Sequence, residues 1–194
     1  MEWEANKTQI HRPLVERASS GDPAAQTELY QLYGRAMYNT AYRMIGNSTT
    51  AEDVMQEAFI QAFQALDRFN FDSTFGYWLK KIVINRSLNY LRKEKLILEK
   101  EREWREEVEL QSGLDDQDNW STEYSLQDIQ KSLKELAPNH KLVFQLYMIE
   151  GYDHEEISEI LKISASTSRS QLSRAKKNLK EILIHQFEKS NVRS

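Results

Sequence analysis

The sequence predicts an all-α protein, in which two small helical domains are joined by an acidic flexible linker and the second domain ends in a helix-turn-helix. Glycine and proline are scarce, at six and three of 194 residues, which favours helices over a sheet protein. Apolar residues recur every three or four positions along most of the chain. One stretch lacks this pattern and is rich in acids and amides, so it separates two helical regions.

Composition limits the classes of protein that the chain can belong to. It has no cysteine, which excludes disulfides and thiolate metal sites. No apolar run approaches the roughly 20 residues of a membrane span, and the first ten residues lack a signal-peptide pattern. We therefore expect a cytoplasmic protein without direct membrane insertion. Its four histidines have no metal-ligand spacing, and we expect no metal and no cofactor.

The first helical domain is predicted over residues 13–96, after an N-terminal arm at 1–12. Pro13 opens a short helix that stops at Gly21. Asp22 and Pro23 then give a cap and a first helical position, which begin a long helix that ends at Gly46-Asn47. A third helix is expected from about Thr49 to Leu66, and a fourth from about Thr74 to beyond Arg92. The segment between them, 67–73, shows no helical pattern and is predicted as a loop.

The second domain is predicted over residues 124–187, between an acidic linker at 97–123 and a tail at 188–194. Ser125 and Asp128 can cap its first helix, and Pro138 opens another that ends at Gly151. That second helix is expected to turn its apolar residues inward, namely Leu142, Val143, Leu146 and Ile149.

The last two helices of this domain form a candidate DNA-binding motif. Asp153 and Glu156 match a capping box, which begins a short helix. A break at 162–164 follows, and Ser164 is placed to cap a second, longer helix from about Ala165. Between Ile160 and Lys180 the charged residues are all Lys or Arg. A short acidic helix, a turn and a basic helix are what insertion into the major groove requires.

The outward face of the longer helix carries basic and hydroxyl side chains. Arg can pair with guanine edges, while Ser and Lys can contact bases or phosphates. The alternative is an ordinary helical hairpin with a solvated basic face, since charge runs often serve solubility alone. The face consists of Ser166, Arg169, Ser170, Ser173, Arg174 and Lys177.

Two blocks of the sequence resemble a known family. The segment TAEDVMQEAFIQAFQALDRF, followed by FGYWLKKIVINRSLNYLRK, looks like the second conserved region of bacterial sigma-70-type factors, and the tail resembles their fourth region. No third region lies between them, as in the small extracytoplasmic-function (ECF) group. The resemblance implies an initiation factor that binds core RNA polymerase, recognises a two-part promoter and helps to open the DNA.

The resemblance assigns roles to residues of the first domain. Asp53, Gln56 and Glu57 match the surface that docks on the clamp coiled coil of the polymerase's largest subunit; the alternative is a solvated helix face. Phe69 matches a loop that shapes a pocket for a flipped base of the minus-10 element; its alternative is a core residue. The other minus-10 candidates, which line the pocket or hold the opened strand, are Lys80, Lys81, Asn85, Arg86, Asn89 and Arg92.

In the second domain, the resemblance places the outward face of the longer helix on the minus-35 element. The break carries Lys162 where the family commonly has glycine, and we expect Lys162 to adopt a turn without positive φ. Ser168 replaces a usual aliphatic residue on the inward face, so looser packing of this helix is expected. His154, in the capping turn, is expected to be solvated.

Partners follow from the same resemblance. They are core RNA polymerase, through its clamp coiled coil and the flap of its second-largest subunit, promoter DNA, and an anti-sigma factor, with a monomer as the free state. A helix-turn-helix regulator that acts without polymerase would explain the tail but not the block from Thr50 to Arg92. An enzyme is disfavoured, because no catalytic constellation is present.

Overall fold

The computed structural model describes residues 10–99 and 126–191, and all of their regular elements are helices. Most of the predicted arm, most of the predicted linker and the last three residues lie outside the described residues. The chain forms two compact units, of which the first holds α2 to α5 and the second α6 to α9. Within the described ranges, no helix is long and apolar enough to cross a membrane.

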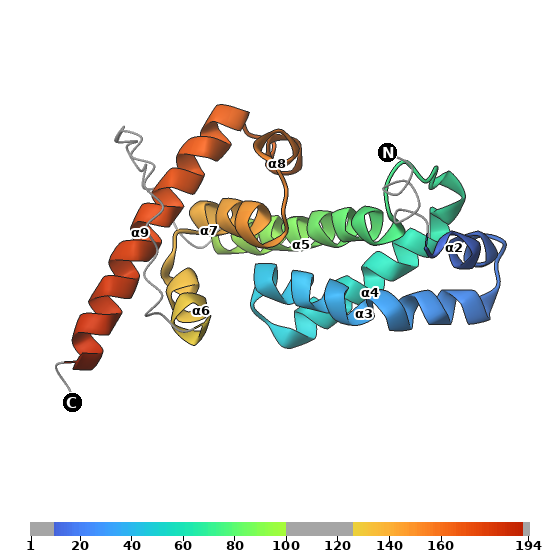
Figure 1. The fold of residues 1–194 in the computed structure, drawn as a ribbon, viewed down its shortest axis with the longest axis horizontal. Helices are drawn as coiled ribbons and strands as arrows, with labels where there is room; N and C mark the ends of the chain where they lie inside the picture. The colour runs from blue at the N-terminus through green and yellow to red at the C-terminus, as the bar shows by residue number, and fades with distance from the viewer. Residues whose placement is uncertain (1–9, 100–125, 192–194) are drawn as a thin grey trace. The chain divides into compact units, whose positions relative to one another are not determined.

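The first unit is a helical bundle in which α3, α4 and α5 all pack on one another, while α2 packs on α3 (Figure 1). A 3-10 turn lies between α4 and α5 and overlaps the start of the segment 67–73, which the sequence predicted as a loop without helical pattern. The elements are α2 (Arg12–Ser19), α3 (Pro23–Ile45), α4 (Ser48–Gln64), the 3-10 turn (Leu66–Arg68) and α5 (Phe75–Glu99).

The ends of α3 and α4 lie close to where their capping residues predict them. The Asp22 side chain accepts a hydrogen bond from the backbone N–H of Ala24 at 2.9 Å, and Pro23 occupies the first turn. Gly46 ends α3 with φ of 81°, a left-handed conformation that glycine adopts without the cost of a Cβ. Asn47 then caps α4 by accepting from the N–H of Thr50 at 3.0 Å.

The core of the first unit consists of apolar side chains from α3, α4 and α5, and several aromatic rings gather near the start of α5. Apolar side chains of α4 such as Val54, Met55 and Phe59 are buried, which leaves the opposite face of α4 in solvent. Near the start of α5, Phe75 contacts both Phe69 and Trp78. Ile84 and Leu88 of α5 are also buried, which extends the core along this helix.

The second unit is organised by its last helix. Helix α9 is long, and α6, α7 and α8 all pack on it (Figure 1). Near the far end of α9, Gln186 donates to Glu135 of α6 at 2.9 Å, and the buried Ser132 bonds the same side chain. The elements are α6 (Leu126–Glu135), α7 (Pro138–Phe144), a π-helical turn (Gln145–Ile149), α8 (His154–Leu161) and α9 (Ala165–Asn191).

The π-helical turn changes which residues face inward. The backbone N–H of Glu150 bonds the carbonyl of Gln145, five residues earlier, at 3.0 Å. This wider turn rotates the following residues relative to an α-helix. Leu146 stays buried, but Ile149 is 43% exposed, so the predicted inward orientation of Ile149 is wrong. Tyr147 and Met148 are exposed beside it.

Candidate nucleic-acid interfaces

Helices α8 and α9 form the predicted helix-turn-helix, and their local sequence explains both starts. Asp153 accepts from the N–H of Glu156 at 2.8 Å, and the Glu156 carboxylate accepts from the N–H of Asp153 at 3.1 Å. Ser164 caps α9 by accepting from the N–H of Thr167 at 3.0 Å. The predicted capping box and the Ser164 cap are both present.

The turn between these helices differs from the sequence-based expectation. Lys162 has φ of 61° and ψ of 42°, so it does occupy the left-handed region, and the expectation that it avoids positive φ is wrong. The N–H of Lys162 bonds the carbonyl of Ser158, and the left-handed conformation brings the N–H of Ile163 to the same carbonyl at 3.2 Å. The reversal that ends α8 therefore requires a strained lysine where glycine would be relaxed.

Replacing Lys162 with glycine is expected to stabilise the second unit by about 1 kcal/mol, because a Cβ is disfavoured in the left-handed region. Lys162→Ala removes the charge but keeps the Cβ, and it is expected to give no such gain. Urea unfolding of the full chain measures both. Equal stabilisation by the two variants would show that the lysine charge, not backbone strain, is unfavourable.

Helix α9 presents the predicted reading face to solvent. Arg169 and Lys177 are exposed, while Ser170, Ser173 and Arg174 are partly exposed. Leu172, Ala175 and Leu179 are buried on the opposite face. The Arg169 guanidinium lies 3.8 Å from a carboxylate oxygen of Glu155 in α8, and both side chains are mostly exposed. Such a pair is weak, so it does not prevent Arg169 from reaching a base or phosphate.

His154 is not simply solvated, as the sequence led us to expect. Its ring stacks on Tyr147 with centroids 4.6 Å apart, and its Nδ1 lies 2.9 Å from the hydroxyl oxygen of Ser168. Ser168 is 0% exposed. The expected loosening of α9 is therefore offset at this position by a hydrogen bond between the helices, because the buried hydroxyl is satisfied.

The environment of His154 lowers its pKa from the ordinary value of 6.5. Burial is the largest cause and the positive charge of Arg169 the next, with a smaller contribution from Lys176; Asp153 and Glu155 act in the opposite direction. The neutral ring is therefore favoured at neutral pH.

The stability of the second unit is expected to fall in mild acid. Because the pKa of His154 is lower in the folded state, protons bind more tightly to the unfolded chain. Its contribution is fully present above about pH 6.5 and is lost as the pH falls from there toward the folded pKa. Urea unfolding followed by methyl NMR of Leu179 at pH 7.5 and 5.5 measures this. His154→Asn, which does not titrate, should show a smaller pH dependence; an equal one would assign the effect to other groups.

Helix α5 carries a polar stripe on its solvent side. Lys81, Asn85, Asn89 and Arg92 recur at intervals of four, four and three residues, which places them along one face. Asn85, Asn89 and Arg92 are exposed, and Lys81 is partly exposed with its ammonium 4.9 Å from the centre of the Tyr77 ring. This α5 stripe can follow a phosphate backbone and offer amides to bases. Lys80 lies outside the stripe, because it directly precedes Lys81 and consecutive residues of a helix do not share a face.

Two residues expected to have different partners contact each other. The Arg86 guanidinium pairs with the Glu57 carboxylate of α4, and its Nε donates to Gln61 at 2.9 Å. Arg86 therefore faces α4 and not the α5 stripe. In this structure Arg86 and Glu57 partly neutralise each other, so each is less available to bind DNA or polymerase.

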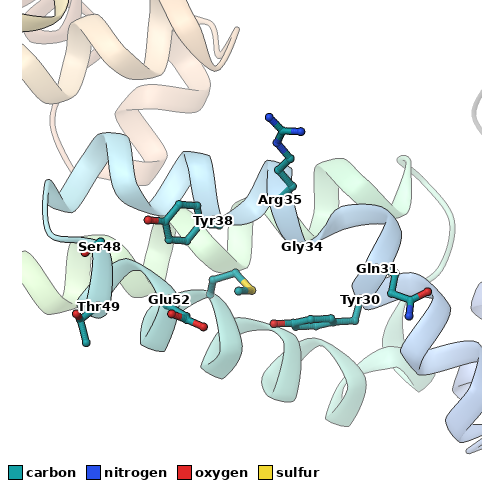
Figure 2. A pocket seen from close by; sticks show the side chains of 9 residues that line it. Tyr30, Gln31, Gly34, Arg35, Tyr38, Ser48, Thr49 and Glu52 are labelled. Carbon is teal, nitrogen blue, oxygen red and sulfur yellow. The ribbon is translucent and has the colours of Figure 1, made fainter.

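The outward face of α4 is exposed at Asp53 and Gln56, as predicted for a docking surface. A hollow of about 470 Å³ lies beside it, between α3 and α4, with Met55 and Glu52 of α4 in its wall (Figure 2). Figure 2 shows Tyr30 and Tyr38 of α3 bordering the same space. Glu52, which accepts a hydrogen bond from Gln56 at 3.4 Å, thus connects the exposed polar face to a partly apolar depression that the sequence alone did not reveal.

Phe69 lies in the core and not on the surface of its loop. It is 6% exposed, with its ring centroid 4.8 Å from Phe71 and 5.0 Å from Trp78. The core alternative for Phe69 therefore describes its position, and its ring has little surface for a base to stack on. It does form part of the wall of a cavity of about 230 Å³, beside Phe71 and Thr74.

Phe71 is the second aromatic residue of the loop, and nothing in the sequence assigned it a role. It is partly exposed and has φ of 61°, an unusual value for a bulky side chain. The Arg12 guanidinium lies 4.7 Å from the centre of its ring. Only the folded chain brings Arg12 to this loop, so no local sequence signal could have indicated the contact.

Comparison with known proteins identifies the two units. Residues 29–97 match the family model for Sigma-70 region 2, and residues 126–179 match that for Sigma-70, region 4. The ECF RNA polymerase sigma-E factor of Escherichia coli is 30% identical over 175 residues, which cover 84% of this chain and 88% of that protein. The chain belongs to the ECF group of the sigma-70 family. It is a sigma factor, which directs RNA polymerase to promoters.

Other relatives agree with this assignment. The ECF RNA polymerase sigma factor SigW of Bacillus subtilis is 29% identical over 176 residues, covering 87% of this sigma factor and 94% of SigW.

The fold resembles that of the sigma factor RpoE in complex with the anti-sigma factor NepR from Bartonella quintana, with a TM-score of 0.57, 24% identity and 81% and 95% of the two chains covered. It also resembles CnrH in complex with the cytosolic domain of CnrY, with a TM-score of 0.56, 24% identity and coverage of 90% and 97%. The regulator that acts without polymerase is not favoured.

Proposed function

We propose that this sigma factor initiates transcription through separate surfaces on its two units: α9 reads the minus-35 element, the α5 stripe holds the opened minus-10 strand, and the outward face of α4 binds core polymerase. The observation that carries the proposal is the separation of charge among the three helices. Basic and amide groups line α5 and α9, whereas Asp53 and Gln56 line the exposed face of α4.

The assignment of α9 to the minus-35 element is supported by its geometry. A recognition helix contacts base edges with residues near its N-terminal end. Ser166, Arg169, Ser170, Ser173 and Arg174 all lie within the first ten residues of α9, which begins at Ala165. Lys177 lies farther along and is proposed to contact phosphate.

The minus-10 surface is proposed to be the α5 stripe, with Lys81 and Arg92 on phosphates and Asn85 and Asn89 on bases. Lys80 lies nearby. Phe69 is proposed to support the loop from inside, and Arg86 to reach DNA only when its contact with Glu57 is broken. Opening exposes base edges that a duplex hides, so amides on this face can act after melting.

Two surfaces are proposed for core polymerase. Asp53, Gln56 and Glu57 suit the clamp coiled coil of the largest subunit, because an acid and amide surface attracts basic side chains and repels DNA. The exposed residues of the π-helical turn, Tyr147, Met148 and Ile149, suit the flap of the second-largest subunit. Three adjacent exposed apolar side chains at one turn are more than a solvated helix needs.

Regulation by an anti-sigma factor is proposed from the two structures in which a protein of similar fold is bound to such a factor or to a cytosolic domain. We also propose that the chain acts in the cytoplasm, is a monomer when free, and is not itself an enzyme.

The test is transcription from a promoter by core polymerase with and without this sigma factor. A library of promoters with randomised upstream and downstream elements supplies the template, and sequencing of the transcripts identifies the selected ones. We expect transcripts only with the factor present, with two enriched sequence blocks at a constant spacing. Enrichment of one block alone would exclude promoter recognition by the unit assigned to the other block. Binding of the factor to selected promoters without polymerase would instead support an autonomous regulator.

A further inference from the structure

His154 connects three elements of the second unit. It is the first residue of α8, its ring stacks on Tyr147 of the π-helical turn at a centroid distance of 4.6 Å, and its Nδ1 is 2.9 Å from the Ser168 hydroxyl of α9. The family resemblance assigns none of these three residues to a partner, and Tyr147 alone is proposed above for the flap.

The hydrogen bond between His154 and Ser168 is made by the residue that directly precedes Arg169, which is proposed to contact a base. Ser168, the fourth residue of α9, is completely buried, and Arg169 follows it on the exposed side. The preceding helix mirrors this arrangement, since Glu155 follows His154 and lies 3.8 Å from Arg169. Consecutive residues of α8 therefore contact consecutive residues of α9, one pair inside and one pair outside.

We propose that His154 is a positioning residue for promoter recognition, which orients the first turns of α9, and Arg169 with them, through its hydrogen bond to Ser168. The inference rests on the proposed reading of the minus-35 element by α9. Apolar packing at this position would be tolerant of rotation of α9 about its axis, because dispersion contacts have little directionality. A hydrogen bond fixes both distance and angle, and rotating the buried hydroxyl away from its partner would leave it unsatisfied.

Two substitutions separate the hydrogen bond from the stacking. His154→Asn places an amide atom one bond from Cγ, where Nδ1 stands in histidine, so it keeps a partner for Ser168 but loses the ring. His154→Phe keeps a ring against Tyr147 but loses the polar atom. Asparagine and phenylalanine have similar helix propensities, so the helix itself should be affected equally.

The measurement uses holoenzyme reconstituted with each full-length variant. The readout is the ratio of transcription from a selected promoter to that from one with a scrambled minus-35 element, together with affinity for core polymerase. We expect His154→Phe to lower the ratio about three- to tenfold, in proportion to the loss of one buried hydrogen bond. His154→Asn is expected to stay within about twofold of wild type. Core affinity should not change in either variant, and circular dichroism checks that the second unit stays helical.

A double-substitution cycle tests the pair directly. Ser168→Ala alone should lower the ratio as His154→Phe does, but it should have no further effect when combined with His154→Phe. Additive losses, a wild-type ratio for His154→Phe, or equal losses for the Asn and Phe variants would each overturn the inference. Arg169→Ala serves as the reference: if it leaves the ratio unchanged, the proposed reading by α9 fails, whereas a loss with Arg169→Ala but none with His154→Phe removes only the role of His154.

Discussion

Holoenzyme carrying Arg169→Ala or Arg174→Ala is expected to lose its preference at one base pair of the minus-35 element for each substitution. Both side chains project from the early part of α9, on the face opposite the buried Leu172 and Leu179. If an arginine makes a bidentate contact with a guanine edge, its removal costs about 1–3 kcal/mol of discrimination at that position. Selection from randomised upstream elements, followed by sequencing, measures the preference position by position.

Lys177→Ala is the matched control for this experiment. Lys177 is exposed one turn beyond Arg174, where a phosphate contact is expected. Its removal should weaken binding to all upstream sequences alike and lower the slope of log K against log salt by about one. Identical preferred sequences for wild type and both arginine variants would exclude α9 as the reader. A changed preference with Lys177→Ala would show that the phosphate and base assignments are exchanged.

Reversing the charge of Asp53 is expected to weaken binding to core polymerase by about 2 kcal/mol or more, since like charges facing each other across an interface are costly. Asp53 is exposed on α4, while the buried face of that helix is complete without it, so Asp53→Lys should leave the fold intact. Glu57 is left unchanged because its carboxylate pairs with Arg86. A fluorescence titration of core with labelled variant gives the affinity, and circular dichroism checks the helicity.

Glu28→Lys provides the comparison, because it makes the same change in charge at an exposed position of α3. We expect wild-type affinity for core with Glu28→Lys, since that residue lies outside the proposed surface. Equal affinities for the Asp53 and Glu28 variants would remove the outward face of α4 from the polymerase interface. Equal losses in both would show that net charge matters more than position.

Local sequence signals located the helices well, because each depends on residues that are neighbours along the chain. Asp22 with Pro23, Asn47 after Gly46, the capping box of Asp153 and the cap at Ser164 lie at or within a residue or two of predicted helix starts. The periodicity of α9 likewise separated Leu172 and Leu179 from the basic face. Membership of the family was also readable from two sequence blocks, and the comparisons confirm it.

Local signals failed where conformation depends on hydrogen bonds or contacts outside the pattern. The periodicity of the helix after Pro138 predicted Ile149 inward, but the π-helical turn rotates it outward. Lys162 takes a positive φ because this conformation reverses the chain so that the N–H of Ile163 reaches the carbonyl of Ser158, which outweighs the preference of lysine. Composition could not indicate either result.

The sequence by itself determined that this chain is helical, that it has two regions of a sigma factor, and which faces of α4 and α9 are polar. Only the tertiary structure decided which candidate residues are buried or already bonded to other parts of the protein. It placed Phe69 among Phe71 and Trp78, paired Arg86 with Glu57, and buried Ser168 against His154. Each of these contacts joins separate elements, so it depends on how helices and loops pack, whereas capping and periodicity report only on neighbours along one helix.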